Sequence, residues 1–249
     1  MKMITPMTSD VDTNHSMSPI KTALPSSTEN DEQDHAVIVL ASGLSLRLGQ
    51  SKQLLSRHGE PLINYMTKIA LATKPLAVIV VIPQEQSAIT DAINRWVCQN
   101  PILYTVINLI PKTGMAHSLS LGIDALTGLK NSVIKRVLIM GVDQVLLEAD
   151  HLTALLAIKN TVVASGYQCL DKASSSDTSK NTIVGLPIVI SMKCLKQWQS
   201  ALLGDKGLRH LIRALPSHQL STVINHQLSY DIDTPEQLFY ARHQHWLDA

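Results

Sequence analysis

Short apolar runs rich in β-branched residues alternate along the chain with segments in which apolar residues recur at every third or fourth position. The runs predict strands, of which residues 36–40 are expected to be buried on both faces of a sheet, and the periodic segments predict amphipathic helices. The expected strands are residues 36–40, 76–82, 103–109, 133–140, 161–165 and 188–190. Two expected helices span residues 115–126 and 149–158. Four more are expected to begin at Pro61, after Ser87 as the N-cap residue, near Gly204 and at Pro235. This alternation predicts an α/β fold, a Rossmann-like three-layer sandwich whose mostly parallel sheet has helices on both faces.

The first 34 residues differ from the rest of the chain. They are rich in Ser, Thr, Asp, Asn and Pro, and their apolar residues keep no lasting period. A segment of this kind buries too little apolar surface to offset the entropy of ordering it. We therefore expect a disordered N-terminal tail over residues 1–34 and a single domain over residues 35–249.

Charge and cysteine content limit the classes of function. The 249 residues carry a formal net charge of +1, so nucleic acid is not an expected partner. No stretch approaches the roughly 18 uninterrupted apolar residues of a membrane span, and we expect no membrane association. The three cysteines lie far apart without a C-x-x-C pair, which favours reduced thiols in a cytoplasmic protein.

The loop after the first expected strand carries the clearest chemistry. Residues 40–52 are rich in glycine and serine and include two cations, Arg47 and Lys52. Small residues let backbone N–H groups approach an anion, and the guanidinium and ammonium suit phosphate oxygens. A P-loop is excluded because Gly49 is followed by Gln50, and the spacing of the glycines excludes a dinucleotide fingerprint. The alternative is a solvated connection with incidental charges.

Acidic residues follow two further segments. Asp143 comes directly after the strand of residues 133–140, at the sheet edge where open α/β sheets bind ligands, and it could hold Mg²⁺ there. A lone aspartate in such a loop is otherwise a common helix cap. Asp231 and Asp233 alternate along an extended segment and so point to one side of it. Asp233 or Thr234 is also suited to cap the last helix.

Two glycine-containing segments precede expected helices. In residues 111–119, Gly114 gives a flexible point, and Ser118 with the first amides of the helix would form a small polar wall. In residues 204–209, two glycines stand beside two cations and could form a second anion site. A plain helix start accounts for either segment equally well on local grounds.

Five motifs together resemble a known family. They are L-A-S-G-x-S-x-R-x-G-x-x-K from Leu40 to Lys52, G-M-x-x-S at 114–118, D-Q at 143–144, G-D-x-G-x-R at 204–209 and D-I-D-T-P at 231–235. The set is similar to that of the MobA-like NTP transferases, and most of all to molybdenum cofactor cytidylyltransferases. Val145 and Leu186 depart from the family pattern, which usually has proline and a polar residue at these positions. The resemblance implies the nucleotide-diphospho-sugar transferase type of fold in a single nucleotidyltransferase domain.

The resemblance also implies a reaction and its residues. The terminal phosphate of molybdopterin would attack the α-phosphorus of a nucleoside triphosphate, and pyrophosphate would leave. Because glycine at position 42 accompanies guanylyl transfer in the family, Ser42 favours CTP, and the product would pass to a molybdenum hydroxylase of the xanthine dehydrogenase type. The implied catalytic residues are Lys52 and Arg47, and the Mg²⁺ ligands are Asp143 and Asp233. The implied nucleotide-binding residues are Leu40, Ala41, Ser42, Gly43, Ser45, Gly114 and Ser118, and the acceptor-side candidates are Gly204, Asp205, Lys206 and Arg209.

Three other functions stay open on the sequence alone. A sugar- or polyol-phosphate nucleotidyltransferase would use the same loop. A carrier that delivers the nucleotide-modified molybdenum cofactor would not need Lys52 together with both aspartates. A flavin- or nicotinamide-dependent oxidoreductase is disfavoured because G-x-G-x-x-G is missing.

Overall fold

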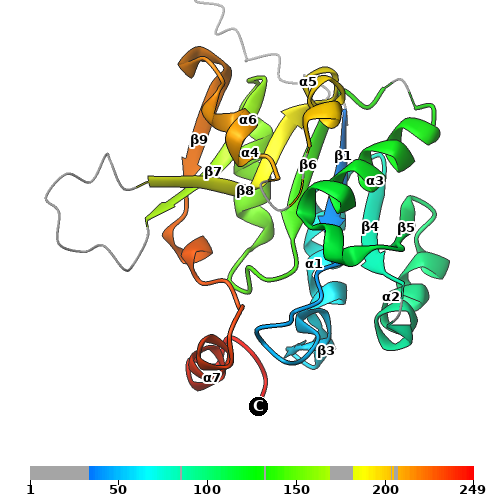
Figure 1. Cartoon of the computed structure of the whole chain (residues 1–249), viewed down its shortest axis with the longest axis vertical. Helices are drawn as coiled ribbons and strands as arrows, with labels where there is room; N and C mark the ends of the chain where they lie inside the picture. The colour runs from blue at the N-terminus through cyan, green and yellow to red at the C-terminus, as the bar shows by residue number, and fades with distance from the viewer. Residues whose placement is uncertain (1–33, 85, 132, 169–181, 203, 205–206) are drawn as a thin grey trace, which may run out of the picture. The chain divides into compact units, whose positions relative to one another are not determined.

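The computed structural model describes residues 34–84, 86–131, 133–168, 182–202, 204 and 207–249. The predicted disordered tail lies outside these residues except for Asp34. Seven strands form one sheet in the order β5-β4-β1-β6-β8-β7-β9 (Figure 1). The strands are β1 His35–Leu40, β4 Val78–Pro83, β5 Leu103–Asn108, β6 Arg136–Gly141, β7 Val162–Gln168, β8 Thr182–Ser191 and β9 Leu220–Ile224. Of these strands, β8 alone runs antiparallel to its neighbours, so the expected mostly parallel sheet is confirmed.

Helices cover both faces of this sheet, as the three-layer architecture requires. They are α1 Leu62–Ala72, α2 Ser87–Gln99, α3 Met115–Gly128, α4 Ala149–Ala157, α5 Met192–Trp198, α6 Arg209–Arg213 and α7 Pro235–His243. A small hairpin of β2 (Ser56–Arg57) and β3 (Glu60–Pro61) precedes α1. Helix α2 begins at Ser87 itself, and Gln86 is its N-cap residue without a side-chain cap. The expected serine cap is therefore wrong. Among the described residues, no helix combines the length and apolar character needed to cross a bilayer.

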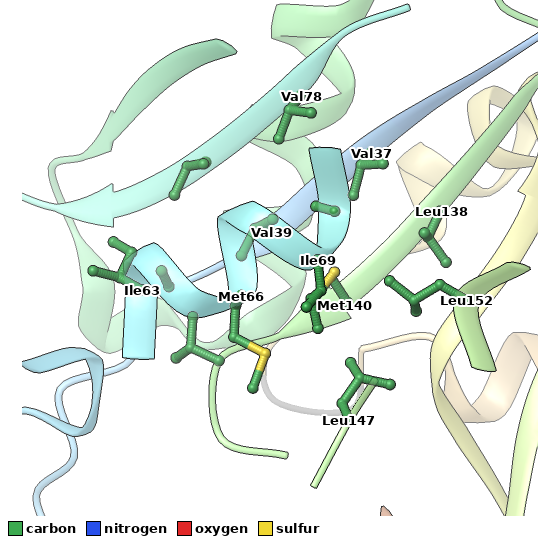
Figure 2. Close-up of a cluster of buried hydrophobic side chains, with 14 of the residues drawn as sticks. Val37, Val39, Ile63, Met66, Ile69, Val78, Leu138, Met140, Leu147 and Leu152 are labelled. Atoms are coloured by element: carbon green, nitrogen blue, oxygen red, sulfur yellow. The ribbon is translucent and has the colours of Figure 1, made fainter. Parts of the chain in front are cut away.

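Alternation along the strands divides the core into two layers. Val37 and Val39 of β1 pack with residues of α1, α2 and α4, and Figure 2 shows this cluster around Met66 and Leu138. Ile38, between the two valines, faces the opposite layer formed with α3, α5 and α6. Successive side chains of a strand point to opposite faces, so an unbroken apolar run is what a strand buried on both faces needs.

The chain order places a crevice beside β1. From β1 the chain proceeds outward through β4 to β5, then returns to β6 on the other side of β1. β1 and β6 are parallel, with Leu40 paired to Gly141, so the loops that follow both strands leave from the same sheet edge. Open α/β sheets bind ligands at such a switch point.

A third apolar cluster holds the C-terminal segment against these loops. Leu48 and Val145, one from each loop, are buried together with Leu238 of α7. Val145 thus has a packing role where the family pattern has proline. Helix α7 starts with a capping box in which Thr234 and Gln237 satisfy each other's backbone amides, with Pro235 in the first turn. These contacts bring Asp233 to the loop after β1.

Candidate active site

The loop after β1 presents a row of free backbone donors. The amides of Leu48 and Gly49 both donate to the carbonyl of Ser45, and the Ser45 hydroxyl accepts from the amide of Lys52. Ser45 and Gly49 have positive φ angles of 52° and 74°, which fold the loop back on itself. The amides of residues 42–47 donate to no acceptor among the described residues. Unpaired amides on a tight loop form a nest suited to an anion.

A buried glutamine holds this loop from beneath. The Gln53 side chain is fully buried, and its Nε2 donates to the carbonyl oxygens of Ala41 at 2.8 Å and Gly43 at 2.7 Å. Satisfying these two carbonyls fixes the orientation of the adjacent peptide planes. The amides of Ser42 and Leu44, which share those two peptide planes, are therefore directed away from Gln53.

Lys52 lies between two carboxylates from distant parts of the chain. Its Nζ donates to Asp143 Oδ2 at 3.1 Å and to Asp233 Oδ1 at 2.6 Å, while Arg47 Nη2 contacts the other oxygen of Asp233 at 2.5 Å. Burial of Lys52 acts to lower its pKa, but the charge of Asp143 and the hydrogen bond to Asp233 outweigh it and raise the pKa. Burial likewise acts to raise the pKa of Asp233, but Lys52 and Arg47 hold it below its ordinary value. Both shifts favour the charged forms of Lys52 and Asp233.

A third carboxylate adjoins this cluster. Asp231 pairs with Gln144 in an isolated antiparallel bridge, so the segment after β6 and the segment before α7 lie side by side. Burial, together with the charges of Asp143 and Asp233, raises the pKa of Asp231. Proximity to two like charges makes ionised Asp231 costly in the absence of a further cation.

A neutral hydrogen-bonded group lies on the other side of the loop. The hydroxyls of Ser42 and Ser118 are 2.6 Å apart, and Asn108 Nδ2 donates to both, at 3.3 Å and 3.1 Å. All three residues are buried. Gly114, the N-cap residue of α3, has φ = 92°, a conformation that favours glycine.

Both groups open onto one cavity of about 780 Å³. Its walls contain most of the residues expected from the sequence: Leu40, Ser42, Gly43, Ser45, Arg47, Lys52, Gly114, Ser118, Asp143, Arg209 and Asp233. Ala41 is buried behind the loop, and its carbonyl accepts a hydrogen bond from Gln53. Gly204 is exposed and is not part of the wall, and Asp205 and Lys206 lie outside the described residues. The roles assigned to these residues remain predictions.

A second cavity of about 220 Å³ adjoins the first and shares Asp143, Leu186, Arg209 and Asp231 with it. Polar groups and apolar side chains both form its wall, and the apolar part includes Leu119, Ile139, Leu208, Ile212 and Leu228. Gln144 also lines it. Its Nε2 donates to the carbonyl of Leu186 at 2.8 Å, and its Oε1 is buried without a partner among the described residues.

The donor set suits a hard divalent cation that is bound together with phosphate. Asp143 and Asp233 each place an oxygen within 3.1 Å of the same ammonium nitrogen, so they already converge on one positive charge. Mg²⁺ is commonly held by one or two carboxylates with the remaining ligands from substrate phosphates and water. No group of three or more candidate metal ligands is found among the described residues, so a protein-only metal cage is not present there.

Gln53, Asn108 and Asp231 are parts of this site that the sequence analysis did not assign. Gln53 and Asn108 are polar residues with no exposed surface. Gln53 bonds to Gly43 within the same loop, whereas Asn108 bonds to Ser42, which is 66 positions away in the chain. The usable signal was position, because Asn108 ends an apolar strand and Gln53 directly follows the predicted phosphate-binding lysine.

Comparison with known proteins identifies the family. The model of the MobA-like NTP transferase domain matches residues 37–221. The chain belongs to this family of nucleotidyltransferases. No curated protein matches the sequence.

Several solved structures share the fold of this chain at low sequence identity. Rv0371c from Mycobacterium tuberculosis H37Rv is 18% identical, with a TM-score of 0.65 and coverage of 85% of this chain and 98% of that one. The 4-diphosphocytidyl-2C-methyl-D-erythritol synthase of Anaerococcus prevotii is 13% identical, with a TM-score of 0.66 and coverage of 85% and 96%. A complex of Rv0371c with manganese, 18% identical, has a TM-score of 0.61 and coverage of 83% and 97%.

Proposed function

We propose that this nucleotidyltransferase moves CMP from CTP onto the terminal phosphate of molybdenum-molybdopterin and releases pyrophosphate, in the cytoplasm, for delivery to a molybdenum hydroxylase. The observation that carries the proposal is the convergence of the free loop amides, two cations and two carboxylates on one cavity. This combination matches a triphosphate with a divalent cation. The five motifs that resemble molybdenum cofactor cytidylyltransferases support the choice of acceptor.

The protein's part in the reaction is alignment and charge neutralisation. Phosphoryl-type transfer needs little covalent chemistry from side chains, because charge develops on phosphate oxygens that positioned donors can stabilise. Lys52 would contact the α-phosphate, and Arg47 with the amides of residues 43–47 would hold the β- and γ-phosphates. A carrier would gain nothing from this ionic cluster, which disfavours the carrier alternative.

Asp143 and Asp233 are the proposed holders of Mg²⁺. When bound, the cation would supply a positive charge that offsets the charge developing on phosphate oxygens in the transition state. For this, Lys52 exchanges at least one carboxylate for phosphate oxygens, which are the stronger anionic partner. The manganese complex of the structural relative Rv0371c supports a divalent cation on this fold.

The second cavity is the proposed acceptor site. The apolar side chains in its wall would contact a flat heteroaromatic ring favourably, whereas sugar hydroxyls placed against them would lose hydrogen bonds to water. The unpaired Oε1 of Gln144 can accept from a ring N–H, and Arg209 can meet a phosphate. Arg209 lines both cavities, so an acceptor phosphate beside it is near the nucleotide.

The test is pyrophosphate release with Mg²⁺, in which CTP, GTP, ATP and UTP are supplied separately with molybdopterin, and in parallel with a polyol phosphate. The proposal expects release with CTP and molybdopterin. Release only with the polyol phosphate would show that the acceptor is a polyol phosphate and not molybdopterin. Release only with GTP would show that the transferred nucleotide is GMP and not CMP. Nucleotide binding without release with either acceptor would favour the carrier.

A further inference from the structure

Two hydrogen-bonded groups line the large cavity, and they differ in charge. The ionic group contains Arg47, Lys52 and the carboxylates, whereas the neutral group contains Ser42, Ser118 and the buried Asn108 beneath them. A triphosphate held by the loop amides and the cations leaves the nucleoside to contact the neutral group. The hydrogen-bonding polarity of that group then decides which nucleobases are accepted.

The orientation of Asn108 is fixed by the backbone. Its Oδ1 accepts from the amide of Ile110 at 2.9 Å, so the NH₂ group must be the part that faces the two serines. Each N–H of that group occupies one lone pair of one serine oxygen. Without Asn108, each serine oxygen would keep one more free lone pair.

The two hydroxyl protons have only one fully bonded arrangement. One proton must lie between the serines, whose oxygens are 2.6 Å apart. Ser118 has a second acceptor, the carbonyl of Gly114 at 3.4 Å, whereas Ser42 has no other acceptor among the described residues. Ser42 therefore donates to Ser118, and Ser118 donates to Gly114. The Ser118 oxygen is then saturated, and the Ser42 oxygen keeps one free lone pair and no free proton.

We propose that Asn108 is a positioning residue that makes Ser42 a hydrogen-bond acceptor toward the nucleobase, and that the site therefore selects bases with an exocyclic amino group over their carbonyl counterparts. Cytosine N4 and adenine N6 carry such donors, whereas the corresponding positions of uracil and hypoxanthine carry acceptors. A carbonyl oxygen facing the Ser42 lone pair would leave both acceptors unpaired and desolvated. The inference rests on the proposed nucleotide site and adds a rule for base selection.

The experiment measures dissociation constants by titration calorimetry in Mg²⁺ without acceptor, for the matched pairs CTP with UTP and ATP with ITP. The wild type is expected to bind the amino member of each pair about tenfold or more tightly. Asn108→Leu keeps the side-chain volume but removes the amide, and the ratio should fall to within about twofold. Ser118→Ala removes the acceptor of Ser42, so its proton is released toward the cavity and the preference should shift to UTP and ITP.

Asn160→Leu is the matched control. Asn160 Nδ2 also donates to a serine hydroxyl, that of Ser221, but the residue lies outside both cavities. This variant should keep the wild-type ratio. Two results would overturn the inference while leaving the nucleotide site in place. One is a wild-type preference that persists in both Asn108→Leu and Ser118→Ala. The other is equal binding of the two members of each pair by the wild type. Failure of the wild type to bind any of the four nucleotides would overturn the proposed function as well.

Discussion

Replacing Lys52 by methionine is expected to shift two properties in opposite directions. The variant should lose turnover, because the ammonium that would contact the α-phosphate is gone. It should gain affinity for Mn²⁺ in the absence of nucleotide, because Asp143 and Asp233 no longer have an internal cation between them. A purely structural lysine would not produce so large a loss of turnover.

The magnitudes follow from burial. Removing one partner of a fully buried ion pair costs about 3–5 kcal/mol, because a charge is left uncompensated. Here the Lys52 side chain is 10% exposed, but the carboxylates of Asp143 and Asp233 are 35% and 28% exposed, and Arg47 still contacts Asp233. Solvent screening lowers the expected loss in free energy of unfolding to about 1–2 kcal/mol. Loss of a preorganised charge stabiliser costs about 3 kcal/mol of activation barrier or more, or roughly 100-fold in rate.

The pH dependence of stability gives an independent check. The raised pKa of Lys52 means that its contribution is complete below 10.5 and is lost as pH rises through the higher folded value. The lowered pKa of Asp233 means that its contribution is present above 3.8 and is lost as pH falls through the lower folded value. The difference in free energy of unfolding between the wild type and Lys52→Met should therefore be constant between about pH 5 and pH 9. It should become smaller as the pH falls below 3.8.

The assays are urea unfolding, single-turnover nucleotidyl transfer and Mn²⁺ binding followed by electron paramagnetic resonance. Lys68→Met is the control, because Lys68 pairs with Glu60 at 2.6 Å on the surface away from the cavity. It should leave turnover and Mn²⁺ affinity unchanged. The reasoning is refuted if Lys52→Met turns over at the wild-type rate, or if its Mn²⁺ affinity is equal to or weaker than that of the wild type.

Three further substitutions test other parts of the site. Gly141→Ala would place a Cβ 2.8 Å from Oδ1 of Asp143 and displace this carboxylate. The variant should bind Mn²⁺ more weakly in the presence of CTP, with little change in its free energy of unfolding. An unchanged Mn²⁺ affinity would contradict the role of Asp143. Gln53→Leu removes the donor to two carbonyls of the loop. It should weaken the binding of CTP, UTP, ATP and ITP equally, by about tenfold in calorimetry. Weaker binding of one nucleotide alone would count against this role of Gln53. Asp231→Asn should raise the melting temperature at pH 7, since a raised carboxyl pKa means that stability falls as pH rises above 3.8, and this gain should vanish below pH 3.8. A lower melting temperature at pH 7 would show that ionised Asp231 is stabilising.

Strands buried on both faces were predictable because a short, unbroken run of β-branched apolar residues suits a buried strand better than a helix or a surface loop. The run of residues 36–40 became β1, and the loop after it was identified by residue types that bind phosphate. β8 was predicted as residues 188–190 but spans Thr182–Ser191. Gly185 and Pro187 favour a turn locally, and pairing with β7 across the sheet overrides that preference.

The contacts that complete the site could not be predicted because they join distant segments. The ion pairs of Lys52 join residues separated by 91 and 181 positions. Asn108 is buried only because its strand ends beside Ser42 and the start of α3. The sequence placed acidic and basic residues at the same sheet edge, but the insertion of Lys52 between the carboxylates depends on side-chain packing that no motif encodes.

The most direct test of the central claim follows the label from CTP. CTP labelled at the α-phosphate, and separately at the γ-phosphate, is incubated with Mg²⁺, molybdopterin and the wild-type protein or Lys52→Met. Nucleotidyl transfer predicts that the α-label appears on the acceptor, the γ-label appears in pyrophosphate, and both products fall about 100-fold in the variant. Appearance of the γ-label in free phosphate while the α-label stays in CDP would show nucleotide hydrolysis and would contradict the account.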